Sequence, residues 1–237
     1  MKMTTKSSVA AVAAAAALFV GTVAAAPSQA APSQATPSQA SRSAAAPSAA
    51  TAKALGQKSL AAVLTSGKVG FDHNARDFDI LTAAVLAVLK AKPTSAVSVL
   101  TDGSVPLTAF LPTDSAFRRL VGSVTGKYYR SEKRVFAAVA GLGIDTVEAV
   151  LLYHVVPGAT ITARKALKAN GVVLTTAQGG TIGVRVTRGP RIELKDKDLN
   201  SRNPRVLLYL TNINYGNRQI AHGINRVLRP IDLPRAS

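Results

Sequence analysis

The chain has 237 residues and a formal net charge of +17, with 29 basic and 12 acidic residues and no cysteine. This length allows one domain with a substantial core, and the lack of cysteine excludes a disulfide framework, thiol chemistry and a lipid-carrying cysteine. A sequence pI near 10.7 favours polyanionic partners such as acidic cell-wall polymers, anionic glycans or phospholipid headgroups.

Residues 1–26 are predicted to be a secretory signal peptide. Lys2 and Lys6 precede an unbroken run of small and apolar residues from position 9 to position 26, and small-x-small cleavage sequences lie at its end. An uncleaved anchor is the alternative, because the run reaches the lower length limit for a membrane span. No other segment is long or apolar enough to cross a bilayer. The protein is therefore expected to be secreted, extracellular or associated with the cell envelope.

Residues 27–52 are predicted to be a disordered linker rich in Ala, Pro and Ser. The triplet Pro-Ser-Gln begins at residues 27, 32 and 37, which makes a five-residue repeat. Such a composition buries too little apolar area to offset the entropy lost on ordering. A stalk through a cell envelope and a passive spacer are both compatible with this segment.

Apolar residues at helical spacing follow the linker. Helices are predicted over residues 59–64, from Asp77 to the residue before Pro93, over residues 113–120 and 131–142, and from Asp145 to the residue before Pro157. The carboxylates of Asp77 and Asp79 are expected to cap the second of these helices.

Short runs of β-type residues are the second pattern. Strands are predicted over residues 97–100, 106–111, 172–174, 182–186, 192–194, 206–210 and 224–228, with turns that contain glycine between several of them. Most helices precede most strands. This order favours an α+β domain with a largely antiparallel sheet.

Tyr153 and His154 lie in the most apolar stretch of the expected domain. Val147, Val150, Leu151 and His154 follow the spacing i, i+3, i+4, i+7, which turns His154 toward the core. Successive helical residues are about 100° apart, so the ring of Tyr153 is expected at the rim of the buried face. An unpaired buried polar group costs roughly 1–3 kcal/mol, so His154 needs an internal hydrogen bond or takes part in recognition.

Three separated segments resemble the fasciclin domain family. They are TAFLPTDSAF at residues 108–117, LYHVVPG at residues 152–158 and HGINRVLRP at residues 222–230. In order, they are similar to the family's first conserved block, its Tyr–His motif and its second conserved block. The resemblance covers residues 71–233. It implies an α+β fold in which helices pack on a β-sandwich wedge.

The resemblance implies a secreted or cell-surface module for adhesion or matrix binding, with neither catalytic activity nor a cofactor. It implicates Tyr153 and His154 in adhesion and places Asp114 beside them, which suggests a hydrogen bond between Asp114 and His154. His222 is a further candidate for a structural hydrogen bond. The Asp-Ile pair associated with integrin contacts in animal members is Asn212-Ile213 here, which argues against that contact.

The sequence contains no recognisable catalytic or metal-binding motif. His73, His154 and His222 have no metal-ligand spacing, and there is no nucleophile elbow, dinucleotide fingerprint or Walker loop. A triad of Ser115, His154 and Asp114 is disfavoured, because Ser115 falls in a first helical turn without evident oxyanion donors. We expect neither an enzyme nor a metal protein.

Two functions follow from these observations. The first is an adhesion or matrix-binding module that contacts a cell-surface protein or polymer. The alternative is an envelope protein that binds an anionic cell-wall or matrix polymer through its basic surface. Export and the sparse aromatic residues argue against nucleic acid. Scattered, solvated basic side chains are expected rather than one basic patch.

Overall fold

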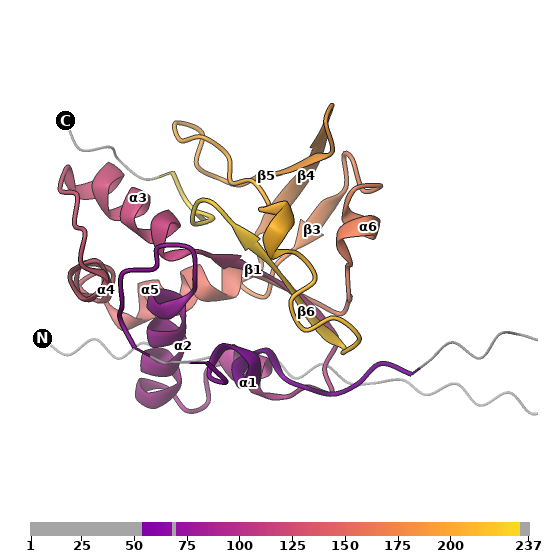
Figure 1. The fold of residues 1–237 in the computed structure, drawn as a ribbon, viewed down its shortest axis with the longest axis horizontal. Coiled ribbons are helices and arrows are strands. Elements are labelled where there is room, and N and C mark those ends of the chain that lie inside the picture. Colours follow the sequence, from indigo (N-terminus) through magenta and orange to yellow (C-terminus); the bar gives the residue numbers. More distant parts are fainter. Residues whose placement is uncertain (1–53, 68–69, 233–237) are drawn as a thin grey trace, which may run out of the picture. The chain divides into compact units, whose positions relative to one another are not determined.

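The structure is a computed structural model that describes residues 54–67 and 70–232. The predicted signal peptide (1–26) and linker (27–52) lie outside the described residues. The folded unit is α+β, as predicted. Figure 1 shows helices α1 to α5 on one side, strands β3 to β5 with α6 on the other, and β1 and β6 between them.

The predicted helices are confirmed with small changes at their ends, except that residues 155–156, predicted as the end of the last helix, belong to strand β2 (Val155–Pro157). The α-helices of the described residues are α1 (Leu60–Leu64), α2 (Asp79–Ala91), α3 (Asp114–Thr125), α4 (Glu132–Ala140), α5 (Ile144–Tyr153) and α6 (Ala163–Ala166). Helix α3 continues beyond the predicted end at residue 120, and Gly126 ends it at a φ of 70°. Glycine is favoured there because side chains with a Cβ are strained in the left-handed region.

The first sheet has the order β2–β1–β6, with β1 at its centre. Strand β1 (Leu107–Pro112) pairs antiparallel with β2 (Val155–Pro157) and parallel with β6 (Gln219–Ile224). Every residue of β1 and β6 is buried. The second sheet is antiparallel and contains β3 (Val173–Thr175), β4 (Thr181–Thr187) and β5 (Arg191–Lys195). The sheets are therefore largely antiparallel, as predicted, and β1–β6 is the parallel pair among the named strands.

Three predicted strands need correction. Residues 97–100 belong to the 3-10 helix η1 (Ala96–Thr101), because the Ser95 hydroxyl accepts from the Val97 N–H and starts a helical turn. Residues 206–210 contain one β-bridge residue, Val206, followed by the 3-10 helix η2 (Leu208–Leu210). The strand predicted at 224–228 is β6, which ends at Ile224. Its hydrophobic pattern is interrupted by the polar residues Gln219 and His222, although both are buried.

The apolar core has two parts. One lies among α2 to α5, and it includes Ile80, Val88 and Leu151. The other lies between the two sheets and includes Phe110 and Ile182. Among the described residues no single helix is long and apolar enough to span a membrane, whereas α4 and α5, bent by 104° at their junction, satisfy length and composition only as a pair.

The resemblance places the start of the domain at Phe71, but the folded unit begins earlier in the chain. Leu60 of α1 is fully buried, and its N–H donates to Gln219 Oε1 at 2.8 Å. Gly56 also forms a β-bridge with Asn217. The segment around α1 is therefore an integral part of the domain, because it is bonded to β6 and to the turn before it.

Candidate functional site

Tyr153 is fully buried, so its predicted position at the rim is wrong. Its hydroxyl donates to the Thr181 carbonyl at 2.7 Å. A Cβ at Gly180 would come within 2.8 Å of the Tyr153 ring, so this glycine makes room for it. Burial raises the pKa of Tyr153 to about 12. Helical spacing does not predict this position, because the neighbours of the Tyr153 ring are Thr181, at the start of β4, and Gly180 before it.

His154 follows α5 as its C-cap and is buried, as predicted. Its Nδ1 lies 2.7 Å from the Val150 carbonyl, and its Nε2 accepts from the Leu228 N–H at 2.9 Å. Because a carbonyl only accepts and an amide N–H only donates, the ring is neutral with its proton on Nδ1. Burial lowers the pKa of His154 to about 4. The ring therefore joins α5 to the second conserved block.

The predicted hydrogen bond between Asp114 and His154 is wrong, since both nitrogens of His154 have other partners. Asp114 is the first residue of α3, and its Oδ1 accepts from the Ile80 N–H at 3.0 Å. It therefore supplies the carboxylate cap of α2 that was expected from Asp77 or Asp79. Sequence reasoning missed this partner because a residue of the next helix provides it.

His222 is buried in β6 and is hydrogen-bonded through both ring nitrogens. Its Nδ1 accepts from the Asn212 N–H at 3.3 Å, and its Nε2 donates to the Ile161 carbonyl at 2.8 Å. Burial lowers the pKa of His222. The Asn212 side chain accepts from the Ala163 N–H at 2.9 Å. His222 and Asn212 thus hold the loop before β6 against the segment that leads into α6.

A surface hollow of about 390 Å³ lies beside this joint, lined by Thr162, Arg164, Asn212 and Tyr215. Tyr215 is 71% exposed. Asn212, which stands where the resemblance places an integrin-contact aspartate, has its side chain oxygen engaged by the backbone. The hollow therefore offers an aromatic ring and a guanidinium group to a partner, but no carboxylate.

Four arginine side chains form a second feature, here called the arginine cluster: Arg119, Arg202, Arg205 and Arg226. The first three are exposed and Arg226 is half-buried. The pKa of Arg226 is lowered by its burial and then by the like charges of Arg119, Arg202, Arg229 and Arg205. Asn225 connects the cluster, because its carbonyl accepts from Arg119 and its side chain accepts from the Arg205 N–H. The expectation of scattered basic side chains does not hold at this place.

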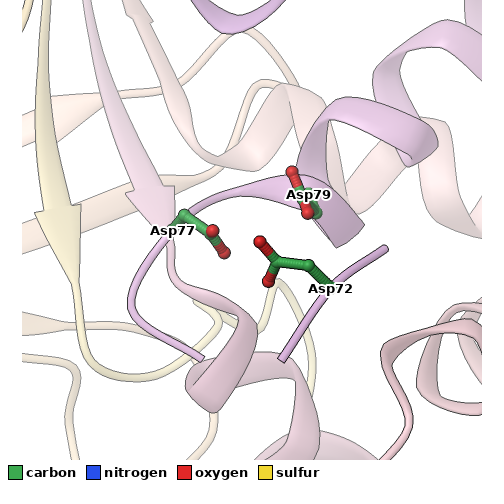
Figure 2. Close-up of side chains that lie close together, drawn as sticks. All are labelled: Asp72, Asp77 and Asp79. Atoms are coloured by element: carbon green, nitrogen blue, oxygen red, sulfur yellow. The ribbon is translucent and has the colours of Figure 1, made fainter. Parts of the chain in front are cut away.

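Five carboxyl groups form a third feature, here called the acidic cluster: Asp72, Asp77, Asp79, Asp114 and Glu132. Oxygens of the first three lie within 4.8 Å of one another, as do oxygens of the last three. Asp72, Asp77 and Asp79 lie within eight residues of the sequence, and Figure 2 shows their carboxyl groups close together. The cluster contains no histidine, so the histidine-based metal motifs considered in the sequence do not predict it. The short spacing between Asp72, Asp77 and Asp79 was the available signal.

Comparison with known proteins gives one family. The model of the fasciclin domain matches residues 81–230. No curated protein matches the chain. Among solved structures, the chain is similar to the FAS1 domain pair from the insect cell adhesion molecule fasciclin I, with 17% sequence identity and a TM-score of 0.43. That match covers 60% of this chain and 45% of the other, so it spans less than half of the solved chain.

Proposed function

Because the chain belongs to the fasciclin domain family, we propose that it is a non-catalytic adhesion module, exported to the cell surface, that binds an anionic wall or matrix polymer. The arginine cluster is the observation that carries this proposal. Within the described part of the chain, none of its four side chains forms an ion pair, whereas the adjacent Arg229 pairs with Asp198.

Unpaired like charges at one place destabilise a fold, so their concentration favours a ligand that supplies the opposite charge. Arginine suits this role because its planar guanidinium donates two parallel hydrogen bonds to carboxylate, sulfate or phosphate groups. Arg119, Arg202 and Arg205 are exposed; Arg119 is on α3, and the other two are on the segment between β5 and η2. Together they offer several contacts to a polymer with repeated anionic groups.

Tyr153 and His154 have a supporting role in this proposal, because both side chains are buried. The His154 ring accepts from the Leu228 N–H, two residues after Arg226. The Tyr–His motif therefore holds the segment that presents Arg226 and Asn225. We propose that His154 contributes to adhesion by positioning this segment, without direct contact between the motif and a ligand.

The test is the affinity of the full chain for fluorescein-labelled heparin, measured from 50 to 500 mM NaCl. Arg119→Gln/Arg205→Gln is expected to weaken binding at least tenfold at low salt and to reduce its salt dependence, because fewer counterions are released. The matched control, Arg185→Gln/Arg188→Gln, removes the same charge from exposed positions outside the cluster. An equal loss of heparin affinity in both double variants would show that only net charge matters. An unchanged affinity of Arg119→Gln/Arg205→Gln would contradict the proposal.

A protein contact at the surface hollow is the second candidate function. Tyr215, which lines the hollow, is 71% exposed, and exposed tyrosines at a hollow are typical of protein contacts. Binding to a cell-surface protein fraction that persists in 500 mM NaCl and is lost in Tyr215→Ala would favour this function over the polyanion. Tyr128→Ala, at an equally exposed ring elsewhere, is the control.

A further inference from the structure

The acidic cluster lies where three helices begin. Asp79, Asp114 and Glu132 are the first residues of α2, α3 and α4. Asp72 and Asp77 come from the segment that precedes α2, and Figure 2 shows their carboxyl groups near that of Asp79. The cluster contains five of the chain's 12 acidic residues, in a protein that is strongly basic as a whole.

We propose that the acidic cluster binds one Ca²⁺ ion. In proteins Ca²⁺ is surrounded by oxygens at about 2.3–2.6 Å, so oxygens on opposite sides of the ion are about 5 Å apart. Both groups of three carboxylates have oxygens within 4.8 Å of one another, and Asp79 belongs to both groups. Because the two groups share Asp79, an ion held by either group is bound by the Asp79 carboxylate.

The charges of the described groups around the cluster do not balance without a cation. Arg118 donates to Glu132 Oε1 at 2.8 Å and offsets one of the five carboxylates. A helix N-terminus carries roughly half a positive charge, so the three helices contribute about 1.5 charges. When all five carboxyl groups are ionised, about 2.5 negative charges are left, close to the charge of one divalent ion.

Two buried oxygens point to a ligand independently of this charge count. Asp114 is fully buried, and although its Oδ1 caps α2, its Oδ2 accepts no N–H or hydroxyl hydrogen among the described residues and has only the Asp77 carboxyl group as a side-chain partner. Asp77 Oδ1 is buried and also accepts no such hydrogen there. A carboxylate oxygen can only accept, so these atoms require a proton or a cation. Helix capping explains Asp114 Oδ1, but it does not explain either of these oxygens.

A proton shared by the carboxyl groups is the competing explanation. Burial and then the side chain of Asp77 raise the pKa of Asp114 to about 8, and burial followed by the charge of Asp77 raises the pKa of Asp79 to about 6. Protons and Ca²⁺ would compete for the same oxygens, so Ca²⁺ affinity should increase from pH 6 to pH 8. The number of carboxylates favours Ca²⁺ over Mg²⁺, because Mg²⁺ usually keeps several waters and takes only one or two carboxylates.

The experiment is a calorimetric titration of the full chain with CaCl₂ at pH 7.5 after removal of metals with EDTA. We expect one ion per chain with a Kd of about 10⁻⁴–10⁻³ M, the range of extracellular calcium modules. The Tm should rise by about 3–10 °C in 10 mM CaCl₂. No binding heat together with an unchanged Tm would refute the site and leave the shared proton as the explanation.

Variants separate a specific site from general screening of charge. Asp72 is exposed, so Asp72→Asn is expected to preserve the fold and to weaken Ca²⁺ binding. The double variant Asp72→Asn/Asp79→Asn should weaken it at least tenfold. Asp145→Asn is the matched control, because Asp145 is an exposed carboxylate in the first turn of α5. An equal Tm rise in the double variant, or MgCl₂ binding as tight as CaCl₂, would overturn the assignment.

Discussion

One neutral imidazole connects the end of α5 with the segment after β6. His154 donates to the Val150 carbonyl and accepts from the Leu228 N–H, a partner 74 positions away in the sequence. The ring has no carboxylate partner in the described structure, and burial keeps it uncharged at neutral pH. At the residue scale, the Tyr–His motif is therefore a structural bridge between distant segments.

Removing this bridge should destabilise the domain. We expect His154→Ala to lower the free energy of unfolding by about 2–4 kcal/mol, because it leaves a cavity and two unpaired backbone groups. Asp114→Ala should cost about 1 kcal/mol through the lost cap of α2. The two losses should add in the double variant, since the side chains share no hydrogen bond. Urea unfolding measures them, with the exposed His73→Ala as control, and strong sub-additivity would indicate a coupling that the structure lacks.

The burial of His154 also predicts a pH dependence. Its folded pKa of about 4 is below its ordinary value of 6.5, so its contribution to stability is present above pH 6.5 and is lost as the pH falls toward 4. The loss amounts to about 3 kcal/mol. Asp79 and Asp114 act in the opposite direction, because raised pKa values favour the folded state at low pH.

The histidine contribution is isolated by comparing the wild type with His154→Gln. Unfolding free energies at pH 7.0 and pH 4.5 should differ more in the wild type, because the variant has no imidazole at this position to protonate. The carboxylates contribute equally to both proteins and cancel in the comparison. Identical pH profiles would mean that the ring of His154 is not held neutral by burial.

At the scale of elements, β6 links both ends of the described structure. Gln219 at its start is fully buried; its Nε2 donates to the carbonyls of Val99 and Asp102, and its Oε1 accepts from the Leu60 N–H. One amide thus joins β6 to η1 and α1. This arrangement explains why α1 belongs to the fold although it precedes the segment that resembles the family.

Gln219→Leu should release α1 from this position. Leucine has a similar volume but leaves two carbonyls and one N–H unpaired, so we expect a loss of about 2–4 kcal/mol in the free energy of unfolding. In limited proteolysis, the Gln219→Leu variant should be cut within residues 56–67 faster than the wild type. Gln178→Leu, at an exposed glutamine, is the control and should change stability by less than about 0.5 kcal/mol. Unchanged protection of α1 would show that its apolar contacts alone hold it.

At the scale of the whole molecule, acidic and basic side chains gather at two places that adjoin on α3, where Arg118 pairs with Glu132 and Arg119 belongs to the arginine cluster. Five of the 12 acidic residues gather at the starts of α2, α3 and α4, while the arginine cluster lies around the segment after β6. We therefore propose one place for a cation and another for a polyanion, a division that net charge alone does not reveal.

The sequence by itself determined the local elements and the inward direction of His154, because helical spacing, capping residues and turn residues act over a few positions. It also predicted the family through three motifs. Only the tertiary structure decided that Tyr153 is buried, that Leu228 rather than Asp114 pairs with His154, and that β6 begins at Gln219. Both charged clusters belong to this second group. Each cluster combines side chains from separate parts of the sequence. Only packing of the chain brings these parts close enough for their charges to interact.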